Sequence, residues 1–231
     1  RIPGTRILAT TDNSSLILAS RSPRRAEILG DAGIKFTVTS ADIDEEVFLS
    51  GAGRSSNTRS PVEVVQRLAF EKARAVAANR LGAFVLGADT VVVLDDEILG
   101  KPGSSGNAVA MLHRLSGRAH EVITGVTVVD PNGTVRTDFA STSVLFRNLE
   151  RSEVANYVAT GSPLDKAGGY GIQDSSFALV ESYDDCYLNV MGLPMCVTIR
   201  LLEISGFRRF STAVCKRHLN FDAACGSKAI K

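Results

Sequence analysis

Two adjacent arginines follow a short apolar run near the start of the chain, within Leu18–Leu29 (LASRSPRRAEIL). Ser22 is a favourable N-cap and Pro23 suits the first helical position, so a helix is expected to begin here. Arg24 and Arg25 then lie in the first turn, where the helix dipole disfavours cations unless an anion is bound. The corner therefore predicts an anion site suited to phosphate. The alternative is that both guanidinium groups point into solvent or pair with acids elsewhere.

A single carboxylate interrupts the most apolar stretch of the chain, Phe84–Leu94 (FVLGADTVVVL). Burying the charge of Asp89 in such a strand costs several kcal/mol unless it is paired or binds a metal. We therefore expect Asp89 to lie where the sheet opens into a cleft, facing a cation or water. The alternative is a carboxylate that caps local backbone at a bulge. Thr90 carries little signal of its own, because threonine is common in strands.

Two lysines lie in segments that could bring them toward these groups. Lys101 stands between a glycine and a proline, which hold the backbone in a fixed bend and present the side chain. Lys72 lies on a helix that is expected to begin at Pro61. Each lysine by itself is more consistent with a solvated surface charge. Both lysines become candidate ligands only if the fold brings them close to the arginine pair and to the carboxylate of Asp89.

An acidic cluster and a glycine-rich loop complete the set of candidate segments. Residues 42–46 (DIDEE) offer carboxylates, of which Mg²⁺ usually takes one or two together with substrate phosphates. A solvated acidic loop is the alternative. Residues 165–173 (DKAGGYGIQ) combine backbone freedom with the amide of Gln173, whose donor and acceptor could read a base edge. Taken alone, this loop favours an ordinary turn.

Strand-like and helix-like segments alternate along the chain and must position these groups. Apolar runs predict strands at residues 16–19, 36–39, 84–94, 122–129, 134–146, 177–182 and 186–190. Periodicity and end signals predict helices at residues 23–32, 61–79, 107–115, 152–159 and 194–204. Ser60 and Glu63 form the expected capping box of the second helix, and Ser152 is the expected N-cap of the fourth. This order predicts an α/β fold with a mixed sheet.

The composition is that of an ordinary globular protein of 231 residues, 44% of them hydrophobic, with a net charge of +1. The small charge and the absence of an aromatic and basic face argue against nucleic-acid binding. The apolar runs are too short to cross a bilayer, so no membrane partner is expected. We expect an N-terminal extension at residues 1–14, one domain at residues 15–206 and a loosely docked basic tail at residues 207–231.

Four cysteines show no paired metal-ligand spacing, and the three histidines do not cluster in the sequence. This usage favours a reducing, cytoplasmic compartment over a disulfide framework. The chain begins at Arg1 rather than at methionine. A targeting peptide that has been removed therefore stays open as an alternative.

Seven segments, taken in order, resemble the Maf family of nucleoside triphosphate pyrophosphatases: LASRSPRRAEIL, FEKARAVA, GADTVVV, LGKP, MLHRLSGRAHEVITGV, DKAGGYGIQ and LNVMGLP. They span Leu16 to Ser205, and the ordered set is far more specific than any one motif. The resemblance implies an elongated mixed sheet flanked by helices, with a central cleft, like that of the inosine triphosphatase relatives. It also implies hydrolysis of a nucleoside triphosphate to the monophosphate and pyrophosphate, assisted by Mg²⁺ or Mn²⁺.

By this resemblance, the catalytic aspartate of the family falls on Asp89, which is also a candidate metal ligand. The acidic metal-binding residue falls best on Glu45, although Asp44 or Glu46 would fit after a slip of one position. The basic phosphate-binding positions fall on Arg24, Arg25, Lys72 and Lys101. The positions associated with substrate choice fall on Arg24, Thr90 and Gln173.

The DKAGGYGIQ form resembles the branch of the family that acts on dTTP and UTP, since the branch for 7-methyl-GTP has a different segment there. Two departures bear on the rim of the cleft. The loop at residues 49–60 is longer than usual, and residues 161–163 (GSP) replace a more typical acidic residue before the proline. The implied partner is the nucleoside triphosphate substrate. Members of the family often form dimers, so a homodimer is one expected assembly.

Two other functions stay open. One is a pyrophosphatase for 7-methyl-GTP or another modified nucleotide, which would share the expected role of removing non-canonical nucleotides. The other is a non-catalytic, nucleotide-binding regulator of cell division, which the family name suggests. Asp89, Glu45 and the four basic residues argue against the regulator, because binding alone does not need the groups that would activate water.

Overall fold

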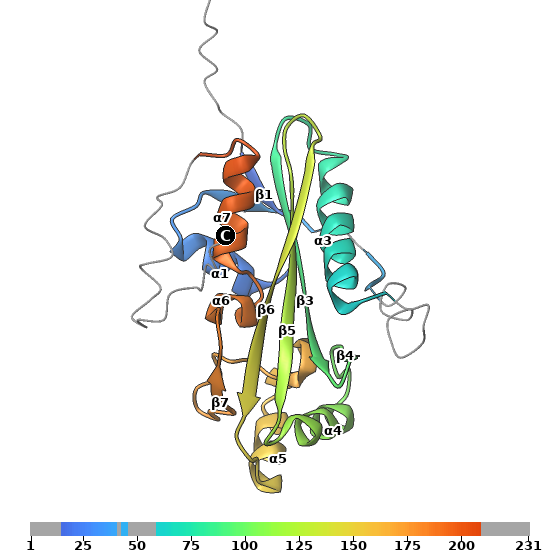
Figure 1. Ribbon diagram of the computed structural model, residues 1–231, viewed down its shortest axis with the longest axis vertical. Coiled ribbons are helices and arrows are strands. Elements are labelled where there is room, and N and C mark those ends of the chain that lie inside the picture. The colour runs from blue at the N-terminus through green and yellow to red at the C-terminus, as the bar shows by residue number, and fades with distance from the viewer. Residues whose placement is uncertain (1–14, 41–42, 46–58, 209–231) are drawn as a thin grey trace, which may run out of the picture.

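The computed structural model describes residues 15–40, 43–45 and 59–208 (Figure 1). The predicted N-terminal extension, most of the predicted loop at residues 49–60 and the tail from residue 209 lie outside the described residues. The described chain forms one mixed sheet with helices packed on both of its faces. This architecture confirms the predicted α/β fold class.

The sheet holds seven strands in the order β2-β1-β3-β5-β6-β7, with β4 paired to β3. The strands are β1 (Leu16–Leu18), β2 (Phe36–Val38), β3 (Phe84–Leu94), β4 (Glu97–Leu99), β5 (Ala119–Val129), β6 (Val135–Phe146) and β7 (Val180–Tyr183). β1 runs parallel to β2 and β3, whereas the pairings of β3 with β4 and β5, and of β6 with β5 and β7, are antiparallel. The long strands β3, β5 and β6 set the long axis of the molecule in Figure 1.

Different helices pack against the two ends of this sheet. They are α1 (Pro23–Asp31), α3 (Pro61–Ala77), α4 (Ser105–Leu115), α5 (Arg151–Ala159), α6 (Tyr187–Met191) and α7 (Met195–Ile204), with short 3₁₀ turns η1 (Ser162–Asp165) and η2 (Ala167–Gly169). In Figure 1, α3 lies on one side of the upper half of the sheet, α1 and α7 lie on the other side, and α4 and α5 lie at the lower end. Among the described residues, no helix combines the length and the apolar character that a membrane span requires.

The apolar core is divided between the two halves of the long strands. One cluster packs α1 and α7 against β1 and β3, around Leu18, Leu29 and Leu202. A second cluster packs α4 and α5 against the lower half of the sheet, around Leu112 and Phe146. Between the parts of β3 that these clusters cover, Asp89 and Thr90 give the middle of the strand two polar side chains.

α3 lies close to the sheet because β3 and β5 carry glycines beneath it. A Cβ at Gly87 would stand 2.3 Å from the carbonyl oxygen of Ala69, and a Cβ at Gly125 would stand 2.5 Å from that of Val65. Neither position has room for a side chain, so the backbone of α3 rests on the backbone of the two strands. This contact fixes the position from which Lys72 reaches β3.

The strand predicted at residues 186–190 is wrong, because residues 187–190 lie in the helix α6 and Cys186 is its N-cap. An apolar run of this length does not distinguish a strand from a buried helix. Gly192 ends the helix with a φ of +109°, in the left-handed region that favours glycine. The amide of Asn189 donates to the carbonyl oxygen of Val122 and to Thr142 Oγ1, both at 2.9 Å, which fixes the helix on the sheet.

Other element boundaries are confirmed or shift by a few residues. The capping box of α3 is confirmed, since Ser60 Oγ accepts from the N–H of Glu63 and the Glu63 carboxylate accepts from the N–H of Ser60. α5 has Glu150 at its N-cap position in place of the predicted Ser152, because Glu153 accepts from the N–H of Glu150 and starts the helix earlier. β7 begins three residues later than predicted, and β4 was too short to predict.

Gly125→Ala is expected to destabilise the protein by about 3 kcal/mol, because the new Cβ would collide with the backbone of α3. Urea unfolding followed by circular dichroism measures the effect. Gly106→Ala in α4 is the matched control, since a Cβ there meets open space, and it should leave the free energy of unfolding unchanged or slightly raised. A Gly125→Ala protein as stable as wild type would contradict the close contact of α3.

Candidate active site

The cleft opens at a gap in the strand pairing along β3. β1 pairs with β3 as far as Leu86, and β4 pairs with it from Val92 onward, so no described strand covers this edge between them. Because side chains alternate along a strand, Asp89 projects toward α3 and Thr90 toward α1. Both line the cleft. The structure thus places Asp89 where the sheet opens, as the sequence predicted.

A single cleft of about 740 Å³ gathers all the predicted site residues that the structure describes. They come from α1, α3, β3, the segments after β2 and β4, and the loop after η2. A cleft of this size is typical of small-molecule sites. The predicted residues in its lining are Arg24, Arg25, Glu45, Lys72, Asp89, Thr90, Lys101 and Gln173.

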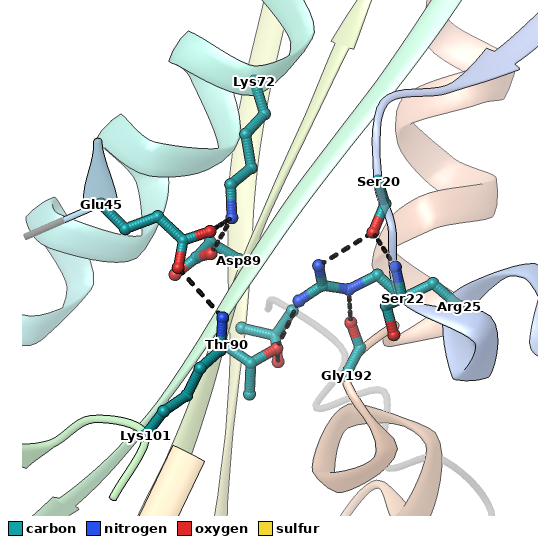
Figure 2. A network of polar contacts seen from close by, with 10 residues as sticks. Ser20, Ser22, Arg25, Glu45, Lys72, Asp89, Thr90, Lys101 and Gly192 are labelled. Carbon is teal, nitrogen blue, oxygen red and sulfur yellow. Dashed lines mark hydrogen bonds and ion pairs between the residues drawn. The ribbon is translucent and has the colours of Figure 1, made fainter. Parts of the chain in front are cut away.

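Two ammonium groups and two carboxylates form an ionic cluster on the α3 side of the cleft (Figure 2). Lys72 Nζ lies 2.5 Å from Asp89 Oδ1 and 2.6 Å from Glu45 Oε1. Lys101 Nζ lies 3.3 Å from Glu45 Oε2, and its side chain is 58% exposed. Lys72 is therefore shared by carboxylates from two segments that are far apart in the sequence, while Lys101 approaches from the solvent side.

Burial makes the charges of this cluster depend on one another. Asp89 is only 8% exposed, and an ionised carboxylate at that depth would be costly without the ammonium of Lys72. Burial alone raises the pKa of Glu45, but the charges and hydrogen bonds of Lys72 and Lys101 outweigh it and lower this pKa below its ordinary value. Glu45 therefore stays ionised at neutral pH.

On the other side of the cleft, Arg25 braces three parts of the fold (Figure 2). Its Nε donates to the carbonyl oxygen of Gly192 (2.8 Å), its Nη2 to Thr90 Oγ1 (3.0 Å) and its Nη1 to Ser20 Oγ (3.4 Å). Thr90 Oγ1 also lies 2.9 Å from Thr124 Oγ1. Three of the five donors of the guanidinium are taken inside the protein, so Arg25 holds α1 against β3 and the turn after α6. Its role as a phosphate ligand stays a prediction.

Arg24 lies next to this brace in the first turn of α1. Its Nη1 is 3.8 Å from Asp165 Oδ2 of η1. Ser22 occupies the predicted N-cap position, but its side chain makes no capping hydrogen bond, and its backbone N–H donates to Ser20 Oγ (3.1 Å). Because Ser22 does not cap the first-turn N–H groups and a guanidinium lies beside them, the corner suits an anion.

The loop after η2 and the helix α6 line the far end of the cleft. Tyr170, Met191 and Gln173 contribute to this wall. A Cβ at Gly171 would stand 3.0 Å from Gln173 Nε2, so the amide of Gln173 lies back over the glycine. An apolar wall with one amide suits a flat heterocycle with a polar edge.

Lys166 was not predicted as a site residue, although it lies in the glycine-rich segment. Lys166 is buried, and its Nζ lies 2.5 Å from the carbonyl oxygen of Ser162, 3.0 Å from Ser162 Oγ and 3.0 Å from Asp165 Oδ1. These three contacts occupy its three N–H donors. Lys166 thus lines the cleft as part of its wall. Ser20, Tyr170 and Gly192 were also missed, although each lies in a segment that resembles the family.

The described residues contain no group of three or more His, Cys, Asp or Glu side chains that could hold a metal ion. Glu45 and Asp89 nevertheless bring two carboxylates to the same ammonium group. Mg²⁺ is often held by one or two carboxylates, with phosphate and water oxygens as its other ligands. The oxygen donors present therefore fit a hard divalent cation that shares the phosphates of a substrate.

A known protein family covers the segments that supply these residues. The model of the family described as Maf-like protein matches residues 15–204. The chain belongs to the Maf-like family. The match spans all eight predicted site residues, and it confirms the family predicted from the sequence.

Close relatives of this Maf-like protein align over almost their whole length. The dTTP/UTP pyrophosphatase of Citrifermentans bemidjiense is 46% identical, over 84% of this chain and 97% of the relative. The dTTP/UTP pyrophosphatase of Moorella thermoacetica is 47% identical, over 84% of this chain and 96% of the relative.

Among solved structures, a HAM1 protein from Coxiella burnetii matches with a TM-score of 0.42 and 16% identity, over 82% of this chain and 99% of that one. The dITP/XTP pyrophosphatase from Mycobacterium abscessus matches with a TM-score of 0.38 and 16% identity, over 58% of this chain and 75% of that one.

A buried histidine supports the apolar wall of the cleft from behind. His120 Nε2 lies 2.8 Å from the hydroxyl oxygen of Tyr170, and its ring packs edge-on against Phe146 and Tyr170. Burial lowers the pKa of His120 to about 4. The imidazole is therefore neutral in the folded protein at neutral pH.

This depressed pKa predicts that stability falls as the pH drops from about 6.5 to about 4, because the unfolded chain takes up a proton there and the folded chain does not. Between about pH 7.5 and pH 5, wild type should lose about 2 kcal/mol more unfolding free energy than His120→Gln. Urea unfolding at both pH values measures the difference. His113→Gln, on the exposed face of α4, is the control and should keep the wild-type slope. Equal slopes for His120→Gln and wild type would refute the neutral, buried imidazole.

Proposed function

We propose that this Maf-like protein hydrolyses nucleoside triphosphates, with dTTP and UTP preferred, to the monophosphate and pyrophosphate. The observation that carries the proposal is that one cleft contains a buried carboxylate bound to Lys72, the uncapped arginine corner of α1 and the amide of Gln173. The relatives named dTTP/UTP pyrophosphatase support the choice of substrate, since they are 46% and 47% identical to this chain.

The basic groups lie where they can hold a triphosphate. Among the described residues, carboxylates take two of the three donors of Lys72, which leaves one for a phosphate oxygen. Lys101 is exposed enough to turn from Glu45 toward a second phosphate. Arg24 and the first-turn N–H groups of α1 would bind from the opposite side. A triphosphate placed between these groups would have its charge compensated from both sides.

The reaction itself is the attack of water on the α-phosphorus. A bond forms from the water oxygen to this phosphorus, the α–β bridging oxygen leaves with pyrophosphate, and the water gives up a proton. Asp89 would orient the water and accept that proton: among the described residues Lys72 Nζ contacts its Oδ1, and Oδ2 would accept from the water. The positive groups stabilise the charge that builds on the leaving oxygens, which is most of what such catalysts supply.

Glu45 and Asp89 would hold the divalent cation, Mg²⁺ or Mn²⁺. When bound, such a cation offsets phosphate charge and makes water a better nucleophile. Lys72 would then keep the two carboxylates together on the protein side.

Product analysis with dTTP, UTP, CTP and 7-methyl-GTP in the presence of Mg²⁺ tests the proposal. Wild type should release pyrophosphate, fastest from dTTP and UTP. Asp89→Asn should lower kcat by about 10²- to 10⁴-fold, the usual loss when a general base is removed. Asp138→Asn is the matched control, because this carboxylate pairs with Arg200 outside the cleft lining, and it should keep the wild-type kcat.

Four outcomes would count against the proposal. Orthophosphate as the product would place the cleavage at another bond. Full turnover by Asp89→Asn would remove this carboxylate from the chemistry. Nucleotide binding without turnover by wild type would favour the non-catalytic regulator, whereas a preference for 7-methyl-GTP would favour the pyrophosphatase for modified nucleotides.

A further inference from the structure

The turn that carries Gln173 needs support from elsewhere in the fold. It lies between η2 and β7 and belongs to neither element. Its backbone closes on itself, with the N–H of Asp174 donating to the carbonyl oxygen of Gly171 (3.0 Å) and that of Ser175 to the carbonyl oxygen of Gln173 (2.8 Å). These contacts shape the turn but do not fix where it stands relative to the cleft.

One buried hydroxyl, that of Tyr157 in α5, holds both ends of this turn. The backbone N–H of Gly171 donates to Tyr157 Oη (3.0 Å), and Tyr157 Oη donates to Asp174 Oδ2 (2.5 Å). Tyr157 has no exposed surface, and its ring packs on Phe177 with centroids 4.7 Å apart. The hydroxyl is therefore a fixed point for the turn whose Gln173 side chain lines the cleft.

A second tier of polar contacts fixes the carboxylate of Asp174. Ser162 Oγ donates to Asp174 Oδ2 (2.8 Å) and lies 3.0 Å from Lys166 Nζ. Burial and the nearby carboxylate of Asp174 raise the pKa of Tyr157, so its hydroxyl keeps its proton at neutral pH. Tyr157, Asp174 and Ser162 are absent from the residues that line the cleft, so they act on a substrate indirectly. Tyr157 and Asp174 act through the turn, and Ser162 acts through the turn and through Lys166.

We infer that Tyr157 is a positioning residue for substrate choice: its hydroxyl fixes the Gly171–Asp174 turn so that the Gln173 amide meets the base of the nucleotide. This inference rests on the proposed function, because it concerns which triphosphates that reaction accepts. It assigns a determinant of selectivity to a side chain that does not line the cleft.

Tyr157→Phe tests the inference, because it removes the hydroxyl and keeps the ring that packs on Phe177. The ratio of kcat/KM for UTP to that for ATP should fall about tenfold, the effect of losing one buried hydrogen bond. The loss should appear mainly in KM for UTP, since the phosphate-binding groups are untouched. Tyr183→Phe on β7 is the matched control and should keep the wild-type ratio.

A double-mutant cycle separates positioning from general stability. If Tyr157 acts through Gln173, adding Tyr157→Phe to Gln173→Ala should change the UTP-to-ATP ratio by less than about twofold. Ser162→Ala, which removes one donor to Asp174, is a milder variant that serves if Tyr157→Phe fails to fold, and it should lower the same ratio.

The inference would be overturned by an unchanged ratio in both Tyr157→Phe and Ser162→Ala. Additive effects in the double mutant, or an equal loss for UTP and ATP with a lower melting temperature, would also overturn it. Failure of the proposed function looks different, because wild type itself would then release no pyrophosphate from any triphosphate.

Discussion

The arrangement of this cleft depends on one ammonium group, that of Lys72, which is bound by two carboxylates at once. Asp89 lies on a strand and Glu45 in a segment that follows another strand, and Lys72 Nζ is within 2.6 Å of an oxygen of each. Two carboxylates that share one ammonium group would repel each other without that cation between them. Among the described residues, this pairing leaves one donor of Lys72 and one oxygen of Asp89, which the proposed reaction assigns to the substrate and to the attacking water.

Parts of the fold without chemistry of their own fix this geometry. The gap between the β1 and β4 pairings exposes the middle of β3, and alternation of side chains then sends Asp89 and Thr90 to opposite faces. Gly87 and Gly125 let α3 approach the sheet backbone, which brings Lys72 within reach of Asp89. Across the cleft, Arg25 joins α1 to the turn after α6. The walls of the cleft are thus set by backbone contact on one side and by a buried guanidinium on the other.

Much of this could be predicted from the sequence, because the decisive signals are local. The eleven-residue apolar run of β3 and the Ser60–Glu63 capping box match the structure. A lone carboxylate in an apolar strand correctly indicated a cleft. The strand predicted at residues 186–190 was wrong, because its identity depends on Gly192 and on hydrogen bonds from Asn189 to strands far away in the sequence. For the same reason, Lys166 and Tyr157 went unnoticed: their partners lie in other segments, and no spacing along the chain indicates them.

In the proposed reaction, water attacks the α-phosphorus beside Asp89. Hydrolysis of dTTP in water enriched in a heavy oxygen isotope, followed by mass spectrometry of both products, shows which phosphorus the water attacks. The heavy oxygen should appear in thymidine monophosphate and be absent from pyrophosphate. Heavy oxygen in the pyrophosphate would show attack on the β-phosphorus and would rule out the proposed reaction.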